Sequence, residues 1–177
     1  MVVEKLAGTD RRSVGRADEV AEETAADQAL FDEVFEAIFF DDPVIRMRAS
    51  DAVEKASRRR PERLFPHKNA LLGELAEIGQ QEVRWHLAQM MPRLPLDPTE
   101  KKRAAAIMQA YLEDKSVLVR VNALEALMAL ARGDGDLEAK ALQLLVDALE
   151  NGAPAEKARA RKLLRAYEGR PRTRQPR

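Results

Sequence analysis

Few residues in this sequence could carry out chemistry. The 177 residues include no Cys and two His, which excludes a disulfide framework, a thiolate zinc site and a cysteine nucleophile. The sequence contains no Gly-rich phosphate loop, no H-E-x-x-H and no G-x-S-x-G motif. Paired carboxylates such as Asp41 and Asp42 fall in a predicted turn, where a structural role is expected. We therefore predict no catalytic residue, no metal site and no cofactor, and we predict that the protein is not an enzyme.

The residues that recur with regular spacing are basic. An apolar residue lies directly before each of Arg46, Arg84 and Arg120, and another lies three positions after it. Lys157 is a weaker fourth copy of this pattern. Successive copies of these four anchors lie about 37 residues apart, a spacing typical of helix-pair repeats. Apolar residues also recur seven positions after the anchors, at Val53, Met91, Leu127 and Leu164. The spacing predicts four copies of one structural unit.

Each anchor lies in an amphipathic segment, and a second such segment precedes it. The preceding segments span residues 30–40, 68–78, 99–112 and 136–149 and place apolar residues at helical spacing. The chain is rich in Ala, Leu, Glu and Arg and shows no sustained alternation of period two, so we predict helices and no sheet. The unit is thus a helix A, a short turn, and a helix B that carries the anchor.

This unit resembles the HEAT repeat family over about residues 27–167. The family places an Asp in the A–B turn and an apolar–Arg pair at the start of helix B, as in Asp42-Pro43-Val44-Ile45-Arg46 and again between Asp114 and Arg120. The second repeat has Gln80 where Asp is expected, and the fourth has Lys157 in place of Arg. The resemblance implies an all-α, right-handed α-solenoid of about four helix-pair repeats, at residues 27–60, 61–95, 96–132 and 133–167.

The resemblance also implies structural roles near the A–B turns for the repeat positions Asp42, Pro43, Arg46, Arg84, Arg120 and Lys157. Asp42 can accept hydrogen bonds from the free amides at the start of helix B, where Pro43 fits the first turn. Ser116 and Asp136 are predicted to cap their helices in the same way. Small residues recur three positions or so after the anchors, which allows stacked helices to approach closely, at Ala49, Ala88, Ala123 and Ala160.

The charges are unevenly distributed although the formal net charge is zero. Acidic residues dominate residues 1–40, and basic residues dominate the segment after residue 150. We predict an acidic, partly disordered N-terminal arm at residues 1–26, with a short helix at about 18–26 that covers the first repeat. We predict a basic, disordered tail at residues 168–177, which has four Arg, two Pro and no apolar anchor.

The solvent side of the B helices is the candidate binding surface, because it lines the concave face in this kind of solenoid. Its residues are mostly basic, whereas a chain of zero net charge would by default distribute its charges evenly. We predict that this groove binds an acidic partner; the alternative is that the basic stems only cover apolar helix edges. The candidate partner-binding residues are Arg48, Lys55, Arg58, His86, Arg93, Asn122, Arg132, Arg159 and Lys162.

Two neighbouring residues of the second B helix need separate interpretation. Trp85 shares its repeat position with Met47, Val121 and Ala158, so we expect it to pack against apolar neighbours. His86 shares its position with polar residues in the other repeats, so we expect it to be solvent-exposed.

Three functions are compatible with the sequence. The first is a non-enzymatic scaffold or adaptor that binds a protein partner, the use that the family resemblance most often implies. The alternative is nucleic-acid binding through the basic groove and the C-terminal tail, as in HEAT-like DNA-binding repair proteins. The third is an accessory protein that resembles the HEAT-like repeats of phycobiliprotein lyases.

The expected environment follows from hydropathy. No apolar run approaches the ~20 residues of a membrane span, and the first residues lack the apolar stretch of a secretory signal. We therefore expect a cytoplasmic protein that does not enter a membrane and is a monomer or a weak homo-oligomer.

Overall fold

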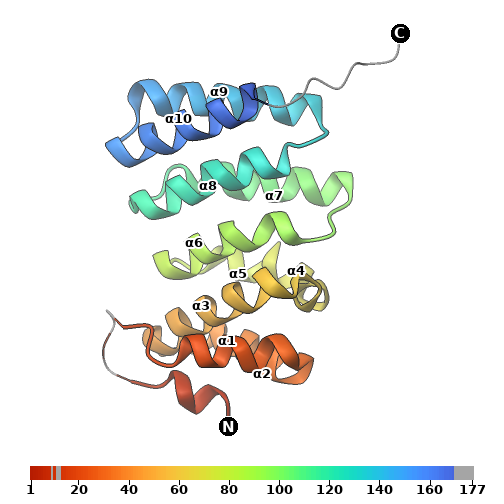
Figure 1. Ribbon diagram of the computed structural model, residues 1–177, viewed down its shortest axis with the longest axis vertical. Helices are drawn as coiled ribbons and strands as arrows, with labels where there is room; N and C mark the ends of the chain where they lie inside the picture. Colours follow the sequence, from red (N-terminus) through yellow and green to blue (C-terminus); the bar gives the residue numbers. More distant parts are fainter. Residues whose placement is uncertain (9, 11–12, 170–177) are drawn as a thin grey trace.

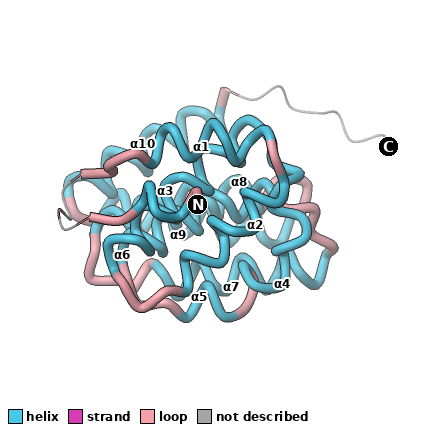
Figure 2. Tube along the Cα trace, turned by 90° about the horizontal axis from the view of Figure 1, so that it is seen from below, coloured by secondary structure: helices cyan, strands magenta, loops and turns pink. Residues whose placement is uncertain are grey.

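The chain folds into helices joined by short turns, as seen in the computed structural model (Figures 1 and 2). The structure describes residues 1–8, 10 and 13–169, and no strand occurs among them. The α-helices are α1 (Ala17–Ala26), α2 (Gln28–Glu36), α3 (Pro43–Arg59), α4 (Lys68–Leu71), α5 (Glu74–Glu77), α6 (Gln81–Met90), α7 (Pro98–Tyr111), α8 (Val117–Leu130), α9 (Gly135–Asn151) and α10 (Pro154–Glu168). Four 3₁₀ turns complete the described part: η1 (Val3–Leu6), η2 (Ala37–Phe39), η3 (Pro61–His67) and η4 (Met91–Arg93).

The helices stack in two rows along the long axis of the molecule (Figure 1). One row, here the B row, consists of α1, α3, α6, α8 and α10, each packed against the next. The other, the A row, consists of α2, then α4 with α5, then α7 and α9. Neighbours in the A row make few contacts with each other, whereas neighbours in the B row contact extensively. The B row is therefore the tighter side of the stack.

Close packing in the B row follows from its small residues. Ala49, Ala88, Ala123 and Ala160 are all buried where consecutive B helices meet. A methyl group at these positions lets two helix backbones approach to the short end of the usual packing distance. The apolar core extends along the whole stack, from Leu6 before α1 to Ala160 in α10. No helix within the described residues is both long and apolar enough to cross a membrane.

Three of the four predicted A helices form, and one does not. The segment 68–78 was expected to be continuous, but the chain forms η3, α4 and α5, with a break at Leu72 and Gly73. Gly73 has a non-helical backbone (φ −127°, ψ −110°), and Pro66 interrupts the turn before α4. Because Gly and Pro both disfavour a helix interior, the apolar periodicity of this segment was not enough to keep it helical.

Helix starts are capped by Asp rather than Ser. Asp42 accepts hydrogen bonds from the first amides of α3, at 2.8 and 3.3 Å, as predicted. The predicted caps Ser116 and Asp136 are wrong, because Ser116 makes no side-chain cap bond and α9 starts earlier than expected. Asp134 caps α9, and Asp114 accepts the backbone N–H of Ser116 at 2.7 Å. At these turns the Asp side chain satisfies amides that have no partner within the helix.

The sequence-predicted end segments are placed as follows. A helix lies where a short covering helix was expected: α1 joins the B row and packs along α3. Of the predicted basic tail, only Glu168 and Gly169 fall within the described residues.

Candidate functional site

The anchor arginines lie at equivalent places beside the A–B turns. Each donates to a backbone carbonyl of its own turn: Arg46 to Asp41 at 3.5 Å, Arg84 to Ile78 at 3.0 Å, and Arg120 to Asp114 at 2.6 Å. Because these guanidinium groups hold the turns, they contribute to the scaffold rather than to a ligand surface.

Two anchors also reach an acid of the following repeat. Arg84 pairs with the Asp114 carboxylate at 2.6 Å, and Arg120 makes a bidentate pair with Glu156, both bonds at 3.0 Å. The Arg120 hydrogen bonds lower the pKa of Glu156 despite the opposing effect of burial. Arg46 has no such partner, since the second repeat offers Gln80, whose amide donates to the Pro43 carbonyl at 2.9 Å. We name these Arg–acid contacts the turn ladder.

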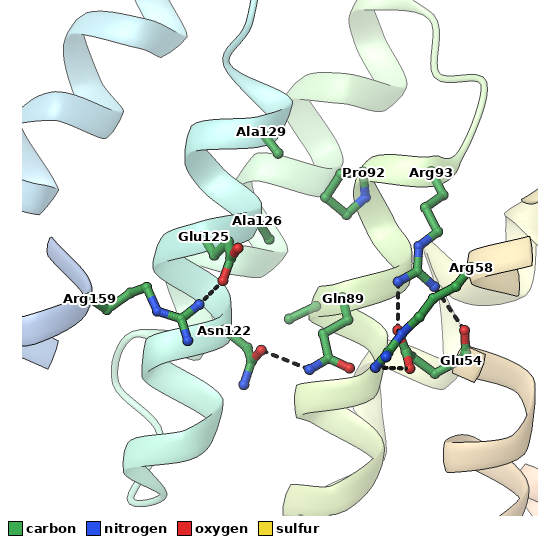
Figure 3. Close-up of a pocket in the computed structure, with 11 residues that line it drawn as sticks. Glu54, Arg58, Gln89, Pro92, Arg93, Asn122, Glu125, Ala126, Ala129 and Arg159 are labelled. Carbon is green, nitrogen blue, oxygen red and sulfur yellow. Dashed lines mark hydrogen bonds and ion pairs between the residues drawn. The ribbon is translucent and has the colours of Figure 1, made fainter. Parts of the chain in front are cut away.

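A second set of contacts, the B-face ladder, crosses the solvent side of the B row. In each, the residue two positions after an anchor contacts the residue five positions after the preceding anchor. His86 Nε2 lies 3.5 Å from Asp51 Oδ1, Gln89 donates to Asn122 at 3.0 Å, and Arg159 forms an ion pair with Glu125 (the last two in Figure 3). Positions that the sequence aligned by period are therefore equivalent in space.

Arg48 holds the same ladder position in the first repeat, but its partners come from the chain before α1. Its guanidinium donates to four backbone carbonyls, those of Leu6, Ala7, Asp10 and Ser13, at 2.7–3.1 Å. The expectation that Arg48 faces solvent is wrong, because the residue is only 5% exposed. Four carbonyl dipoles without a carboxylate satisfy this buried cation, so Arg48 fastens the N-terminal segment to α3.

His86 is likewise not solvent-exposed, and this expectation too is wrong. It is 7% exposed, and its Nε2 accepts a hydrogen bond of 3.1 Å from the indole N–H of Trp85, which packs against the core as predicted. Burial raises the pKa of the adjacent Asp51, but the contact with the His86 ring and the hydrogen bond from Lys55 outweigh it and leave this pKa below its usual value. Lys55 bridges Asp51 and Asp18, at 2.7 and 2.6 Å.

The predicted residues that do come together line one hollow of about 420 Å³ on the B face, here called the groove (Figure 3). Arg58, Arg93, Asn122 and Arg159 line it, whereas Arg48, Lys55, His86, Arg132 and Lys162 do not. Lys55 lies in an adjoining hollow between α1 and α3 that also includes Arg58. The complete lining is Glu54, Arg58, Ala88, Gln89, Pro92, Arg93, Asn122, Glu125, Ala126, Ala129 and Arg159.

Glu54 organises one wall of the groove. Its side chain is 1% exposed and pairs with Arg58 at 2.6 Å and with Arg93 at 2.5 Å. Arg93 also donates to the Ser57 hydroxyl at 2.7 Å. Burial raises the pKa of Glu54, but the hydrogen bonds from the two arginines outweigh it, so the net pKa is lowered and the carboxylate stays ionised at neutral pH.

Sequence reasoning overlooked Glu54, although its position four residues before Arg58 on one helix was a usable signal for an ion pair. The contact with Arg93, 39 residues away, had no such local signal. It depends on η4 bringing Arg93 beside α3.

The floor of the groove is small and apolar, and it contains one unused acceptor. Pro92, Ala126 and Ala129 lie between the two Arg–Glu walls (Figure 3), and Ala88 completes the small apolar part of the lining, here called the floor. The Gln89 side-chain N–H donates to Asn122, while its buried Oε1 receives no hydrogen bond from the described residues. Such a surface can take a ligand that presents anionic groups to the arginines.

Comparison with known proteins yields no relative: no protein-family model, no curated protein and no solved structure matches the chain. What the groove does must therefore be argued from its own geometry.

Proposed function

We propose that the chain is a right-handed α-solenoid of four HEAT-type repeats that acts as a non-enzymatic adaptor. Two features support the repeat assignment. The B-face ladder joins residues at constant offsets from the anchors, and in the turn ladder two successive anchor arginines each pair with an acid of the following helix pair. Such periodic contacts are those of a stack in which each repeat touches only its neighbours.

The ligand of this adaptor is an acidic, extended segment of a protein partner, bound in the groove. The observation that carries this proposal is the combination of Arg58, Arg93 and Arg159 around an alanine-rich floor. The small side chains of the floor leave room for an extended peptide backbone. Carboxylates on either side of that backbone can reach the free donors of Arg58 and Arg159.

The partial neutralisation of the three groove arginines favours a peptide over a nucleic acid as the ligand. Glu54 serves two of them and Glu125 the third, so the groove has three cations against two buried or half-buried anions. With one net positive charge the groove can match a short segment that carries few carboxylates, whereas tight binding of a phosphodiester backbone requires the neutralisation of several phosphates. The accessory-protein hypothesis also requires a protein partner and shares the test below.

The test compares three probes by fluorescence anisotropy with the full chain. The probes are a labelled peptide of alternating Glu and Ala, a labelled oligo-dT and a labelled DNA duplex, at about 50 mM and about 200 mM salt. We expect the peptide to bind and both nucleic acids to bind more weakly. Tighter binding of either nucleic acid, with a steep loss on adding salt, would replace the adaptor proposal by the nucleic-acid alternative.

Variants locate the binding. R58A/R159A removes two groove cations and leaves Glu54 paired with Arg93, so we expect peptide affinity to fall about tenfold, or about 1.4 kcal/mol. The control K102A/R132A removes two exposed cations that lie outside the groove. Equal losses in both double variants would mean that binding is nonspecific charge attraction, and the groove would not be the site.

A further inference from the structure

One large apolar side chain is exposed on a helix of the B row. The large apolar side chains exposed among the described residues are those of Met1, Val14, Phe40, Phe65, Leu118 and Val146. All except Leu118 lie before α1, in the turns or in the A row. Leu118 lies in the first turn of α8 and is 55% exposed. A single exposed apolar residue is common on protein surfaces, so its surroundings decide what it can do.

Leu118 continues the face of α8 that lines the groove. The groove residues Asn122, Glu125 and Ala129 lie four, seven and eleven positions after it on the same helix. With 3.6 residues per turn, these four side chains point within about 60° of one another, so they share one side of α8. The Asn122 amide donates to the Leu118 carbonyl at 2.8 Å. Asn122 lies at the end of the groove away from Ala129 (Figure 3), so Leu118 lies just beyond that end.

The other B helices have no comparable side chain at this repeat position. Leu118 lies two residues before the anchor Arg120, and its equivalents are Val44 in α3, Glu82 in α6 and Ala155 in α10. Val44 is 6% exposed, Glu82 is charged and Ala155 is small. Among these four positions, only Leu118 combines size, apolar character and exposure.

We propose that Leu118 is a specificity-determining contact for the groove ligand, which is an extended acidic segment with one bulky apolar side chain. This inference rests on the proposed function: the carboxylates occupy the groove, and the apolar side chain packs on Leu118. Arg58 and Arg159, which are 58% and 29% exposed, select the acidic part by charge. The apolar part is selected because covering Leu118 removes apolar surface from water.

The spacing within the ligand follows from the helix. Glu125, the partner of Arg159, lies seven residues after Leu118. This separation is about 10 Å along the axis of α8. Because an extended chain advances about 3.3 Å per residue, the apolar side chain lies about three residues from the carboxylate that reaches Arg159.

The test compares labelled peptides by fluorescence anisotropy with the full chain. The parent peptide is a run of alternating Glu and Ala with Ser residues on both sides. Two derivatives carry Leu in place of the Ser that lies about three residues before or after the run. We expect one of them to bind about fivefold more tightly than the parent, since only one chain direction places its Leu on Leu118. A derivative with Leu at the far end of the Ser flank should bind like the parent.

Variants assign the gain to one residue. Leu118→Ser should abolish the tighter binding of the Leu derivative. The matched control Val146→Ser removes another exposed apolar side chain, 39% exposed on α9 in the A row, and should keep the full gain. A double-mutant cycle over the two peptides and the two chains isolates the contact between the ligand Leu and Leu118 from general apolar adsorption. Thermal unfolding of each variant checks that the fold is intact.

Three outcomes would overturn the proposal. The first is equal affinity of the unmodified chain for the parent and both near derivatives. The second is a gain that persists in Leu118→Ser, which would place the apolar contact elsewhere. The third is self-association of the chain, by sedimentation, that Leu118→Ser abolishes, which would identify a second copy as the cover of Leu118. If the parent peptide binds and R58A/R159A weakens it, such a failure rejects this inference alone, whereas absence of any peptide binding rejects the proposed function as well.

Discussion

Arg48 and Arg159 occupy the same repeat position near the two ends of the B row, yet Arg48 is buried and Arg159 is partly exposed. Arg48 is buried by the chain before α1 and surrounded by four carbonyls. Arg159 remains 29% exposed and pairs with Glu125, itself 53% exposed. The repeat fixes where a side chain stands, while the neighbouring segment decides whether it becomes part of the core or stays available to a ligand.

The largest expected difference between the two arginines is in the stability that each contributes, which substitution by Ala measures. Arg48→Ala leaves four carbonyls without their donor and should lower the free energy of unfolding by about 3 kcal/mol. Arg159→Ala breaks one half-exposed ion pair and should cost about 0.5 kcal/mol. Urea denaturation measures both. Equal costs would mean that the N-terminal segment does not depend on Arg48.

The two carboxylates that pair with the groove arginines should also contribute unequally to stability, and the buried one should contribute more. Glu54→Gln removes a buried partner of two arginines and should cost about 2 kcal/mol at neutral pH, whereas Glu125→Gln should change stability by less than about 0.5 kcal/mol.

The pH dependence follows from the lowered pKa of Glu54. A carboxylate whose folded pKa lies below its ordinary value of 4.5 stabilises the fold above that pH, and this contribution is lost as the pH falls through the folded value. The unmodified chain should therefore lose stability below about pH 4.5, and Glu54→Gln should show a shallower loss than Glu125→Gln. Thermal unfolding from pH 3 to pH 7 measures this, and identical slopes would contradict it.

Two glycines test how closely the N-terminal segment surrounds Arg48. Gly15 and Gly133 both have positive φ, at 57° and 76°. A Cβ on Gly15 would lie 2.9 Å from Arg48 Cζ, whereas one on Gly133 would have nothing within 4 Å. Gly133→Ala should cost about 1 kcal/mol from backbone strain alone, and Gly15→Ala about 2 kcal/mol. If the two variants melt together, the contact with Arg48 is not tight.

The smallest expected effect concerns the exposed ion pair between α1 and α3. Asp18 is 75% exposed and pairs with Lys55, so Asp18→Ala should cost about 0.5 kcal/mol at low salt and almost nothing at high salt. A double-mutant cycle with Lys55→Ala isolates the pair. A cost that persists at high salt would point to packing rather than charge.

Periodicity made much of the fold predictable. The anchors located α3, α6, α8 and α10, four of the five helices of the B row, because a helix pair cannot bury its apolar face alone and must repeat the pattern to do so. The prediction of a continuous A helix at 68–78 is wrong because apolar spacing carries no information about the backbone preference of Gly73 and Pro66.

The candidate site was less predictable. Arg58, Arg93, Asn122 and Arg159 were found because the B face itself is periodic. The burial of Arg48 could not be found in this way, because its partners are backbone carbonyls of a segment outside the repeats. The only trace in the sequence is the pair Gly8 and Gly15, where the backbone has positive φ and passes against the guanidinium.

The unequal ends of the B row also have a dynamic consequence. Among the described helices, α10 has one neighbour in its row, α8, whereas α3 is held on both sides. In a stack stabilised by nearest-neighbour interfaces, the unit with the fewest interfaces opens at the lowest free energy. Amide hydrogen exchange should therefore be fastest in α9 and α10 and slow progressively toward α3, so that the molecule loosens from its C-terminal helix pair.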